Sequence, residues 1–320
     1  MPHGIALPIF PDALFDQQAD LWNMYRAYTM DRRVLFVGEQ SAYGALFLYS
    51  HGAASVDGLI ASPRVRKFAR RHYAREGIVE YPDAPRGLYD ILIGTNDESL
   101  LAPDGKILHD DGRIETADPK WHEPKLHVGS GGVTLPGWIN IDNQRCDGID
   151  VLLDVSQGLP FTNARFIFAE HLLEHLTFSQ ARVFLASCRA ALREDGILRL
   201  STPNLDWVWH LQYRPHAWTG PQDAMRDCFE LNRSFRAWGH QFLYNYPALE
   251  SLLHASGFAR VRRFDYGVSD TPELAGLERH ERYDDSPELP HVIVVEASGR
   301  REPAPLDAAA EQFEQDFRIR

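Results

Sequence analysis

A glycine-rich turn and three carboxylates are the most informative residues in the sequence. The segment HVGSGG, residues 127–132, follows an apolar run, and Asp142, Asp154 and Glu170 each come at the end of a later apolar run. Glycines at such a turn let the backbone pass close to a ligand, because no Cβ stands in the way. A carboxylate at the end of the next strand can accept hydrogen bonds from both hydroxyls of a ribose. The pattern therefore predicts a site for a cofactor that contains a ribose.

Each of these features also has an ordinary structural explanation. A glycine turn after a strand is common, and an acidic residue at a strand end is often simply solvated. In an open α/β sheet, however, ligands bind along the edge where the strands have their carboxyl ends. Three successive acidic strand ends after one glycine turn favour a ligand site.

The first 120 residues alternate apolar runs with segments of helical spacing. We expect an amphipathic helix over residues 11–29, followed by strands and helices in alternation. The expected strands are 32–39, 55–62, 78–81 and 89–95, and the expected helices are 42–52 and 63–77. This alternation predicts a mostly parallel sheet. The turns PDGK and DDGR predict a hairpin or a loose connector over residues 106–109 and 113–116.

The same alternation of strands and helices begins again at Lys125, after a domain boundary that we place near Asp118–Trp121. The expected strands are 125–129, 138–142, 149–155, 164–171, 196–203, 259–267 and 291–298, and the expected helices are 177–196 and 245–257. Gly196 and Gly257 are expected to close the two helices. We therefore expect a first domain at 1–120, a second at 121–300 and a peripheral tail at 301–320.

The composition argues against several classes of partner. A protein that grips a phosphate backbone usually has a basic face, whereas this chain has a net charge of -12. No apolar run approaches the ~20 residues needed to span a bilayer, and the first residues lack the pattern of a signal peptide. We expect a cytoplasmic protein that binds neither nucleic acid nor membrane. The sequence does not indicate its oligomeric state.

Four segments together resemble the class I S-adenosylmethionine (SAM)-dependent methyltransferases. They are LHVGSGGVTLPGWINID, GLPF, FAEHLLEHL and LREDGILRLSTPNL. The resemblance covers residues 124–298 and is greatest to a subgroup of small, type 11-like predicted bacterial methyltransferases with a short link between the first two strands. It implies an α/β, Rossmann-like fold with a seven-stranded, mostly parallel sheet whose last strand is antiparallel. It also implies SAM as the cofactor.

The resemblance assigns a role to each part of the predicted site. Residues 129–131 would approach the methionine part of SAM, and Asp142 would hold the ribose. Residues 154 and 155 would flank the adenine, and residues 170 and 171 would face the methyl group. In full, the implied cofactor-binding residues are Gly129, Ser130, Gly131, Asp142, Asp154, Val155, Glu170 and His171. The family often has cysteine where this chain has Ser130, which is a mild change.

The first half of the chain resembles part of a second domain of the same kind. Residues 32–96 keep Gly38 but have Gln40 and Ala42 where the family has glycines, and Ile60 replaces the ribose-binding carboxylate. We expect a partial, degenerate Rossmann-like half that does not bind SAM. The alternative is an ordinary βαβ domain that does not derive from a methyltransferase domain.

Residues 203–246 form a long aromatic insertion between a strand and a helix. Insertions of this length inside compact domains tend to be functional, and four of the seven tryptophans lie here. We expect a lid over a small-molecule or glycan-like acceptor, although a small satellite core would explain the aromatic residues too. The expected substrate contacts are Trp207, His210, Trp238 and His240.

A hydroxyl acceptor would be helped by a base near the methyl group. The candidates are His171, Glu174, His175 and His240. We expect no metal, because HLLEH lacks the glutamate that follows the first histidine in HExxH and the three cysteines have no metal-binding spacing.

Two other functions remain open from the sequence. The chain could bind SAM without turnover, as a regulatory or scaffolding protein. It could also be a NAD-dependent oxidoreductase, because Asp142 suits that ribose as well. The short link after Gly131 argues against this, since it leaves no helix N-terminus for a pyrophosphate.

Overall fold

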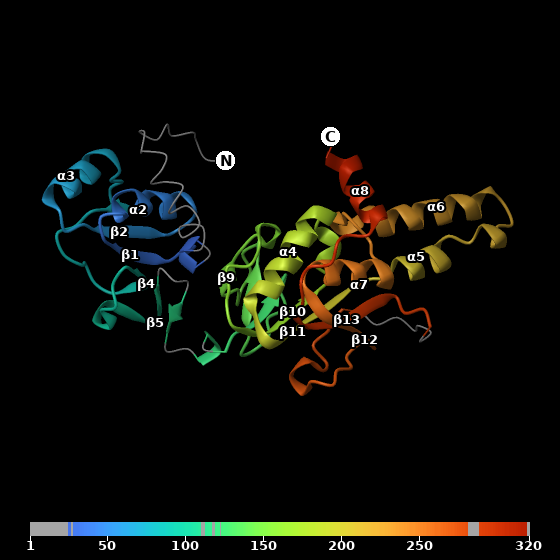
Figure 1. Ribbon diagram of the computed structural model, residues 1–320. Coiled ribbons are helices and arrows are strands. Elements are labelled where there is room, and N and C mark those ends of the chain that lie inside the picture. Colours follow the sequence, from blue (N-terminus) through green and yellow to red (C-terminus); the bar gives the residue numbers. More distant parts are fainter. Residues whose placement is uncertain are drawn as a thin grey trace. The chain divides into compact units, whose positions relative to one another are not determined.

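The computed structural model describes residues 25–26, 28–109, 113–116, 119–121, 123–280 and 288–318. The chain forms two compact units, Met1–His122 and Glu123–Arg320, which are considered separately (Figure 1). Most of the helix expected over 11–29 lies outside the described residues, and its final residues Tyr25, Arg26, Tyr28 and Thr29 are helical.

The first unit contains a six-stranded sheet with the strand order β3-β2-β1-β4-β5-β6. Its elements are β1 (Arg33–Val37), α2 (Ser41–Ser50), β2 (Ser55–Leu59), α3 (Pro63–His72), β3 (Val79–Glu80), β4 (Tyr89–Ile93), β5 (Leu101–Leu108) and β6 (Ile114–Glu115). The first five strands pair in parallel, and β6 pairs with β5 antiparallel. The expected alternation and the expected hairpin are both confirmed, whereas the origin of this unit as a degenerate Rossmann-like half stays a prediction.

The turn after β1 is filled by the protein's own side chain. Gly38 has a φ of 120°, and a Cβ on it would come within 2.7 Å of Gln40 Oε1. Ile60 is fully buried. Both features agree with the expectation that this unit lacks a SAM site, which stays a prediction.

The second unit contains a seven-stranded sheet with the order β12-β13-β11-β10-β7-β8-β9. Its strands are β7 (Lys125–Val128), β8 (Ile139–Asp142), β9 (Val151–Leu152), β10 (Ala164–Glu170), β11 (Leu192–Pro203), β12 (Phe258–Phe264) and β13 (Val292–Arg300). Its helices are α4 (Phe178–Ala191), α5 (Leu205–Gln212), α6 (Pro221–Arg236), α7 (Tyr246–Ala255) and α8 (Ala308–Arg318). Strand β13 pairs antiparallel with both neighbours, and the other pairs are parallel. This is the sheet that the resemblance to class I methyltransferases implied.

The central strands are buried because they are almost continuously apolar. Six of the seven residues of β10 are buried, as expected for a parallel strand covered on both faces. Arg199 of β11 is a fully buried exception. Its Nε lies 2.7 Å from Glu278 Oε1, and one terminal nitrogen lies 2.8 Å from Glu296 Oε1. These two carboxylates pair with the buried guanidinium.

The helix expected over 177–196 is shorter than predicted at its C-terminus. It begins with a capping box between Thr177 and Gln180 and ends at Ala191, and Leu192 already has extended backbone angles. Gly196 therefore lies in β11 instead of closing the helix. A Cβ there would come within 2.9 Å of the Ala164 carbonyl oxygen, so the glycine allows close pairing with β10.

The aromatic insertion is helical, not a loop. Helices α5 and α6 are joined through the 3-10 turn η5 (Pro215–Ala217), and η6 (Ala237–Gly239) follows α6. Buried Asp227 of α6 fixes the connection between the two helices, because it accepts hydrogen bonds of 2.9 Å from the Arg214 N–H and the Trp218 indole. The helices were not predicted, although Met225, Cys228 and Phe229 of α6 recur at helical spacing.

The C-terminal tail, expected to be peripheral, contains α8 and packs on the second unit. The ring of Phe313 lies 5.8 Å from Phe178 and 5.2 Å from Phe242. Buried Glu314 accepts a 2.6 Å hydrogen bond from Arg182 of α4. Among residues 301–317, whose side chains the structure describes, only Glu314 is buried, so the tail lies on the surface of the second unit and contacts it through α8.

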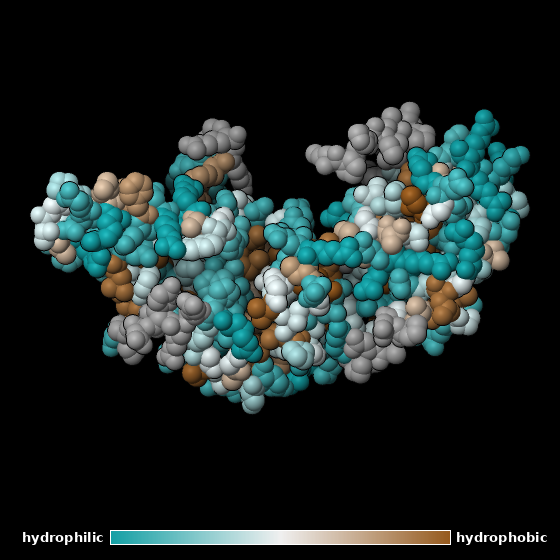
Figure 2. Space-filling model, turned by 180° about the vertical axis from the view of Figure 1, so that it is seen from behind, coloured by the Kyte–Doolittle hydropathy of each residue, from teal (hydrophilic) through white to brown (hydrophobic). Residues whose placement is uncertain are grey.

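The described residues include no helix that is both long and apolar enough to cross a membrane. Figure 2 shows a mostly hydrophilic surface, which hydrophobic side chains reach only in separate areas.

Candidate active site

The turn between β7 and β8 is shaped by two glycines with different surroundings. Gly129 and Gly131 have φ values of 69° and 52°, a region that favours glycine. A Cβ on Gly129 would come within 2.9 Å of Leu172, whereas a Cβ on Gly131 would meet nothing within 4 Å. Gly129 is therefore required by packing, and Gly131 borders open space that a ligand can enter.

Asp142, at the carboxyl end of β8, holds this turn in place. Its Oδ2 accepts a 2.8 Å hydrogen bond from the Gly131 N–H, and its Oδ1 accepts one of 2.8 Å from the Gln144 N–H. Each carboxylate oxygen has a second lone pair. The half-buried carboxylate can therefore stabilise the turn and still accept hydrogen bonds from ligand hydroxyls.

Ser130 lies between the two glycines and has an unsatisfied hydroxyl. Its side chain is 5% exposed, and its Oγ has no hydrogen-bond partner among the described residues. Buried polar atoms almost always have partners. An open glycine turn, an unpaired buried hydroxyl and a half-buried carboxylate fit the polar groups of SAM.

The residues expected beside the adenine lie at the end of β9. Asp154 is exposed and caps the 3-10 turn η3 (Val155–Gln157), where its Oδ1 accepts a 3.0 Å hydrogen bond from the Ser156 N–H. Val155 is buried. The structure thus gives Asp154 a local capping role and leaves its second oxygen for other partners.

Glu170 is buried and fixes a distant segment of the chain. Its carboxylate accepts hydrogen bonds from the N–H groups of Arg279 and His280, and its Oε2 lies 3.3 Å from His280 Nδ1. Burial raises the pKa of Glu170, but these partners outweigh it and hold the pKa below its usual value. Glu170 in turn raises the pKa of His280. The carboxylate expected to face the methyl group is therefore already occupied by protein partners.

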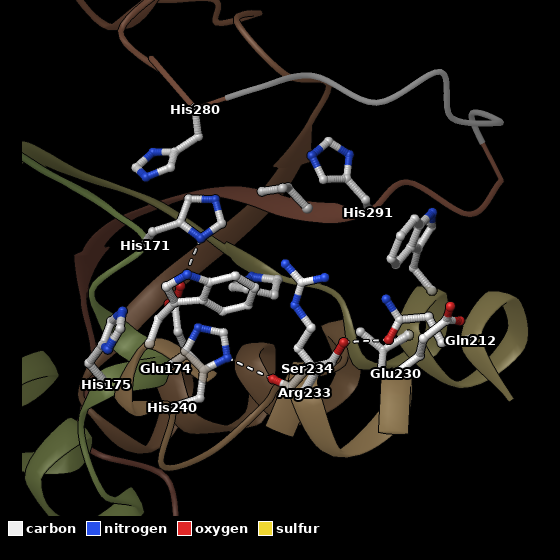
Figure 3. A pocket seen from close by; sticks show the side chains of 15 residues that line it. His171, Glu174, His175, Gln212, Glu230, Arg233, Ser234, His240, His280 and His291 are labelled. Carbon is white, nitrogen blue, oxygen red and sulfur yellow. Dashed lines mark hydrogen bonds and ion pairs between the residues drawn. The ribbon is translucent and has the colours of Figure 1, made fainter. Parts of the chain in front are cut away.

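A cavity of roughly 800 Å³ opens at the carboxyl ends of β10 and β11, beside α5 and α6 (Figure 3). Its lining residues are His171, Glu174, His175, Pro203, Trp207, Val208, Gln212, Glu230, Arg233, Ser234, Trp238, His240, His280, His291 and Val292. All four candidate bases are brought to this cavity.

His171 and Glu174 form a dyad on the cavity wall. His171 has a φ of 49°, and its Nδ1 lies 2.8 Å from Glu174 Oε1. Glu174, in the 3-10 turn η4 (Leu173–His175), has no exposed surface, and its Oε2 accepts a 3.0 Å hydrogen bond from the Thr202 hydroxyl. These contacts fix the imidazole of His171 beside the cavity.

His175 and His240 lie together on the same wall. Their ring centroids are 5.1 Å apart, and His240 Nδ1 lies 2.7 Å from the carbonyl oxygen of Ser234. Burial lowers the pKa of His175, which favours the neutral ring. With Glu174, these residues form a group of potential metal ligands. The expectation of no metal rested on the HExxH and cysteine spacings, which cannot detect ligands brought together by folding.

Three of the four expected substrate contacts lie at the cavity. Trp207, Trp238 and His240 line it. The indole of Trp238 lies 5.7 Å from the His240 ring, and the Arg233 guanidinium lies 5.2 Å from the indole centroid. His210 does not belong to the lining. It is exposed, and its Nδ1 lies 2.7 Å from the carbonyl oxygen of Asp206 in its own helix.

Sequence reasoning missed several lining residues. Arg233, Glu230 and Ser234 come from α6, which was not predicted as a helix, and Gln212 comes from the end of α5. His280 and His291 come from the connection between β12 and β13. The position of α6 beside the strand ends is a tertiary feature, and its sequence alone carries no signal for it.

Comparisons with known proteins find only weak structural likenesses. No protein-family model matches the chain, and no curated protein matches its sequence. Among solved structures, a SAM-dependent methyltransferase from Mesorhizobium loti is similar at 15% identity, with 89% of this chain and 97% of that chain covered and a TM-score of 0.29. A SAM-dependent methyltransferase from Thiobacillus denitrificans in complex with S-adenosyl-L-homocysteine is similar at 20% identity over 34% and 51%, with a TM-score of 0.25. Likenesses this weak carry no functional argument, and the fold assignment rests on the strand order.

Proposed function

We propose that the chain is a SAM-dependent methyltransferase that methylates a hydroxyl of a small-molecule or glycan-like acceptor. One observation carries the proposal: the open glycine turn with Asp142 and the cavity lie at the carboxyl ends of parallel strands in one sheet. Strand β7 leads into the turn and pairs in parallel with β10, which leads to the cavity. A donor in the turn and an acceptor in the cavity would therefore be neighbours.

The reaction needs alignment more than it needs covalent chemistry. The acceptor oxygen forms a bond to the methyl carbon while the bond from that carbon to the sulfonium sulfur breaks. The enzyme holds the two reactants in line and excludes water. The hydroxyl proton must leave, and a positioned base can take it. With its Nδ1 held by Glu174, His171 presents its Nε2 as the proton acceptor.

The cavity suits a ring that carries hydroxyls. Trp207 and Trp238 provide aromatic faces, and Gln212, Glu230 and Ser234 provide polar groups. Rings with apolar faces and polar edges match such a lining, and small-molecule sites generally combine apolar walls with a few polar groups. This combination supports a sugar-like or other hydroxylated acceptor.

The two rival functions predict different ligand responses. A NAD-dependent oxidoreductase would need a place for the pyrophosphate, but the described residues 129–138 between β7 and β8 contain no helix to provide an N-terminus. A silent SAM-binding protein would bind the cofactor without turnover. Thermal unfolding with SAM, S-adenosylhomocysteine and NAD distinguishes the first case, because a ligand stabilises the state that it binds.

We expect SAM and S-adenosylhomocysteine to raise the unfolding temperature, and NAD to leave it unchanged. A ligand at 100 times its Kd stabilises by about 2.7 kcal/mol, which is easily measured. Release of S-adenosylhomocysteine with a panel of hydroxylated acceptors then tests turnover. Stabilisation by NAD alone would overturn the proposal, and SAM binding without turnover on any acceptor would favour the silent protein.

A further inference from the structure

Glu174, His175 and His240 direct potential ligand atoms toward a common point on the cavity wall. One carboxylate oxygen and one nitrogen from each ring all lie within 4.8 Å of one another. In Figure 3, the three side chains lie close together at one end of the cavity. Glu174 and His175 belong to η4, whereas His240 follows η6, so the insertion completes the group.

Further hydrogen bonds hold two of these side chains in the form that binds metals. A carbonyl oxygen can only accept, so His240 Nδ1 must donate to Ser234 and its Nε2 keeps a free lone pair. Glu174 is oriented by Thr202 and His171. Such outer hydrogen bonds typically fix the orientation and tautomer of metal ligands.

The charge of Glu174 also calls for a cation. Its side chain is fully buried, and among the residues that the structure describes no lysine or arginine forms an ion pair with it. A buried carboxylate is costly unless it is paired or coordinates a metal. In the described part of the chain, its basic ion-pair partner is His171.

The donor set selects a class of metal. Two imidazoles and one carboxylate form a ligand set of catalytic zinc, which leaves a fourth position open. Mg²⁺ and Ca²⁺ prefer oxygen ligands.

We propose that Glu174, His175 and His240 form a binding site for a divalent transition metal of the zinc type, with an open position toward the cavity. Binding of the metal does not depend on the proposed function. A role of the metal in polarising an acceptor hydroxyl does rest on it.

The test uses the full chain, with any affinity tag removed, after treatment with a chelator and in the absence of SAM. Equilibrium dialysis against Zn²⁺ measures the stoichiometry, and the visible absorption of Co²⁺ reports its coordination. We expect one ion per chain, a Co²⁺ spectrum typical of four or five ligands, and no competition by excess Mg²⁺.

Substitutions then identify the ligands. His240→Ala and His175→Asn should each weaken Zn²⁺ binding at least tenfold, whereas His216→Ala, at an exposed histidine in η5, should not change it. Circular dichroism identifies a variant that has unfolded, and His175→Asn provides a second test if His240→Ala does not fold. The proposal is overturned if the wild-type chain binds no ion, or if both folded variants bind like the wild type. Metal binding without SAM binding would contradict only the proposed function, and SAM binding without metal binding only this site.

Discussion

Glu170 and His280 are 110 residues apart in the sequence, yet Oε2 of the carboxylate lies 3.3 Å from Nδ1 of the imidazole. The pair joins the end of β10 to the segment that precedes β13. The His280 ring also lies 4.2 Å from the ring of His171. The ion pair therefore positions one wall of the cavity relative to the dyad.

This pair should be visible as a raised pKa of His280. The hydrogen bond to Glu170 raises the pKa above its ordinary value, with a smaller contribution from the charge of Glu174. We expect NMR titration to show this, and Glu170→Gln to return the pKa of His280 toward the value of a free histidine. An unchanged pKa in that variant would show that the two side chains are not paired in solution.

The pH dependence of the protein's stability follows from the directions in which the pKa values of His280 and Glu170 are shifted. The pKa of His280 is higher in the folded state than in the unfolded state. Its contribution to the free energy of unfolding is therefore complete below the unfolded pKa of about 6.5, and it is lost as the pH rises through the folded pKa. Because the pKa of Glu170 is lowered, its contribution is present above its unfolded value of about 4.3 and is lost as the pH falls through the folded value. The pair should stabilise the fold most between these limits.

The buried network around Arg199 should be essential for stability. Arg199→Ala would leave Glu278 and Glu296 as buried carboxylates without their cation, which typically costs about 3–5 kcal/mol. Chemical denaturation should detect this loss. Arg262→Ala is the control, because Arg262 and Asp270 are both exposed and such pairs contribute little. Equal effects of the two substitutions would contradict the role given to the network.

Trp207 should matter for turnover but not for cofactor binding. Trp207→Ala should impair methyl transfer while leaving SAM affinity within about threefold, a difference under ~1 kcal/mol. Trp209→Ala is a matched control on the same helix, since Trp209 is exposed and lies outside the cavity lining. Loss of SAM binding in Trp207→Ala would show that the insertion belongs to the cofactor site.

The sheets could be predicted because each strand carries a local signal. The continuous apolar run of β10 and the capping residues Thr177 and Gln180 determine their elements without distant partners. The end of α4 could not be predicted in this way. Gly196 is typical of a helix C-terminus in sequence, and only its approach to the Ala164 carbonyl shows that it belongs to a strand.

The site could be predicted only in part for the same physical reason. The turn at Gly129 and the carboxylate of Asp142 follow directly from strand ends. His280 depends on an ion pair with Glu170, and Arg233 depends on the packing of α6 beside the strand ends. The partners of such residues are set by tertiary structure, so spacing along the chain does not identify them.

The most direct test of the account is the binding of SAM by isothermal titration calorimetry. We expect one site per chain, because the first unit has Gln40 and Ile60 where a cofactor site would need glycine and a carboxylate. Asp142→Ala should weaken binding by about 1–3 kcal/mol, as expected when a charged partner of buried hydroxyls is removed. Asp142→Asn keeps an acceptor for the Gly131 N–H but removes the charge. It therefore distinguishes the effect of the lost charge from the effect of a disrupted turn. Asp147→Ala, at an exposed carboxylate nearby, should bind like the wild type. Two sites per chain, no binding at all, or equal affinity of the Asp142→Ala and Asp147→Ala variants would contradict the account.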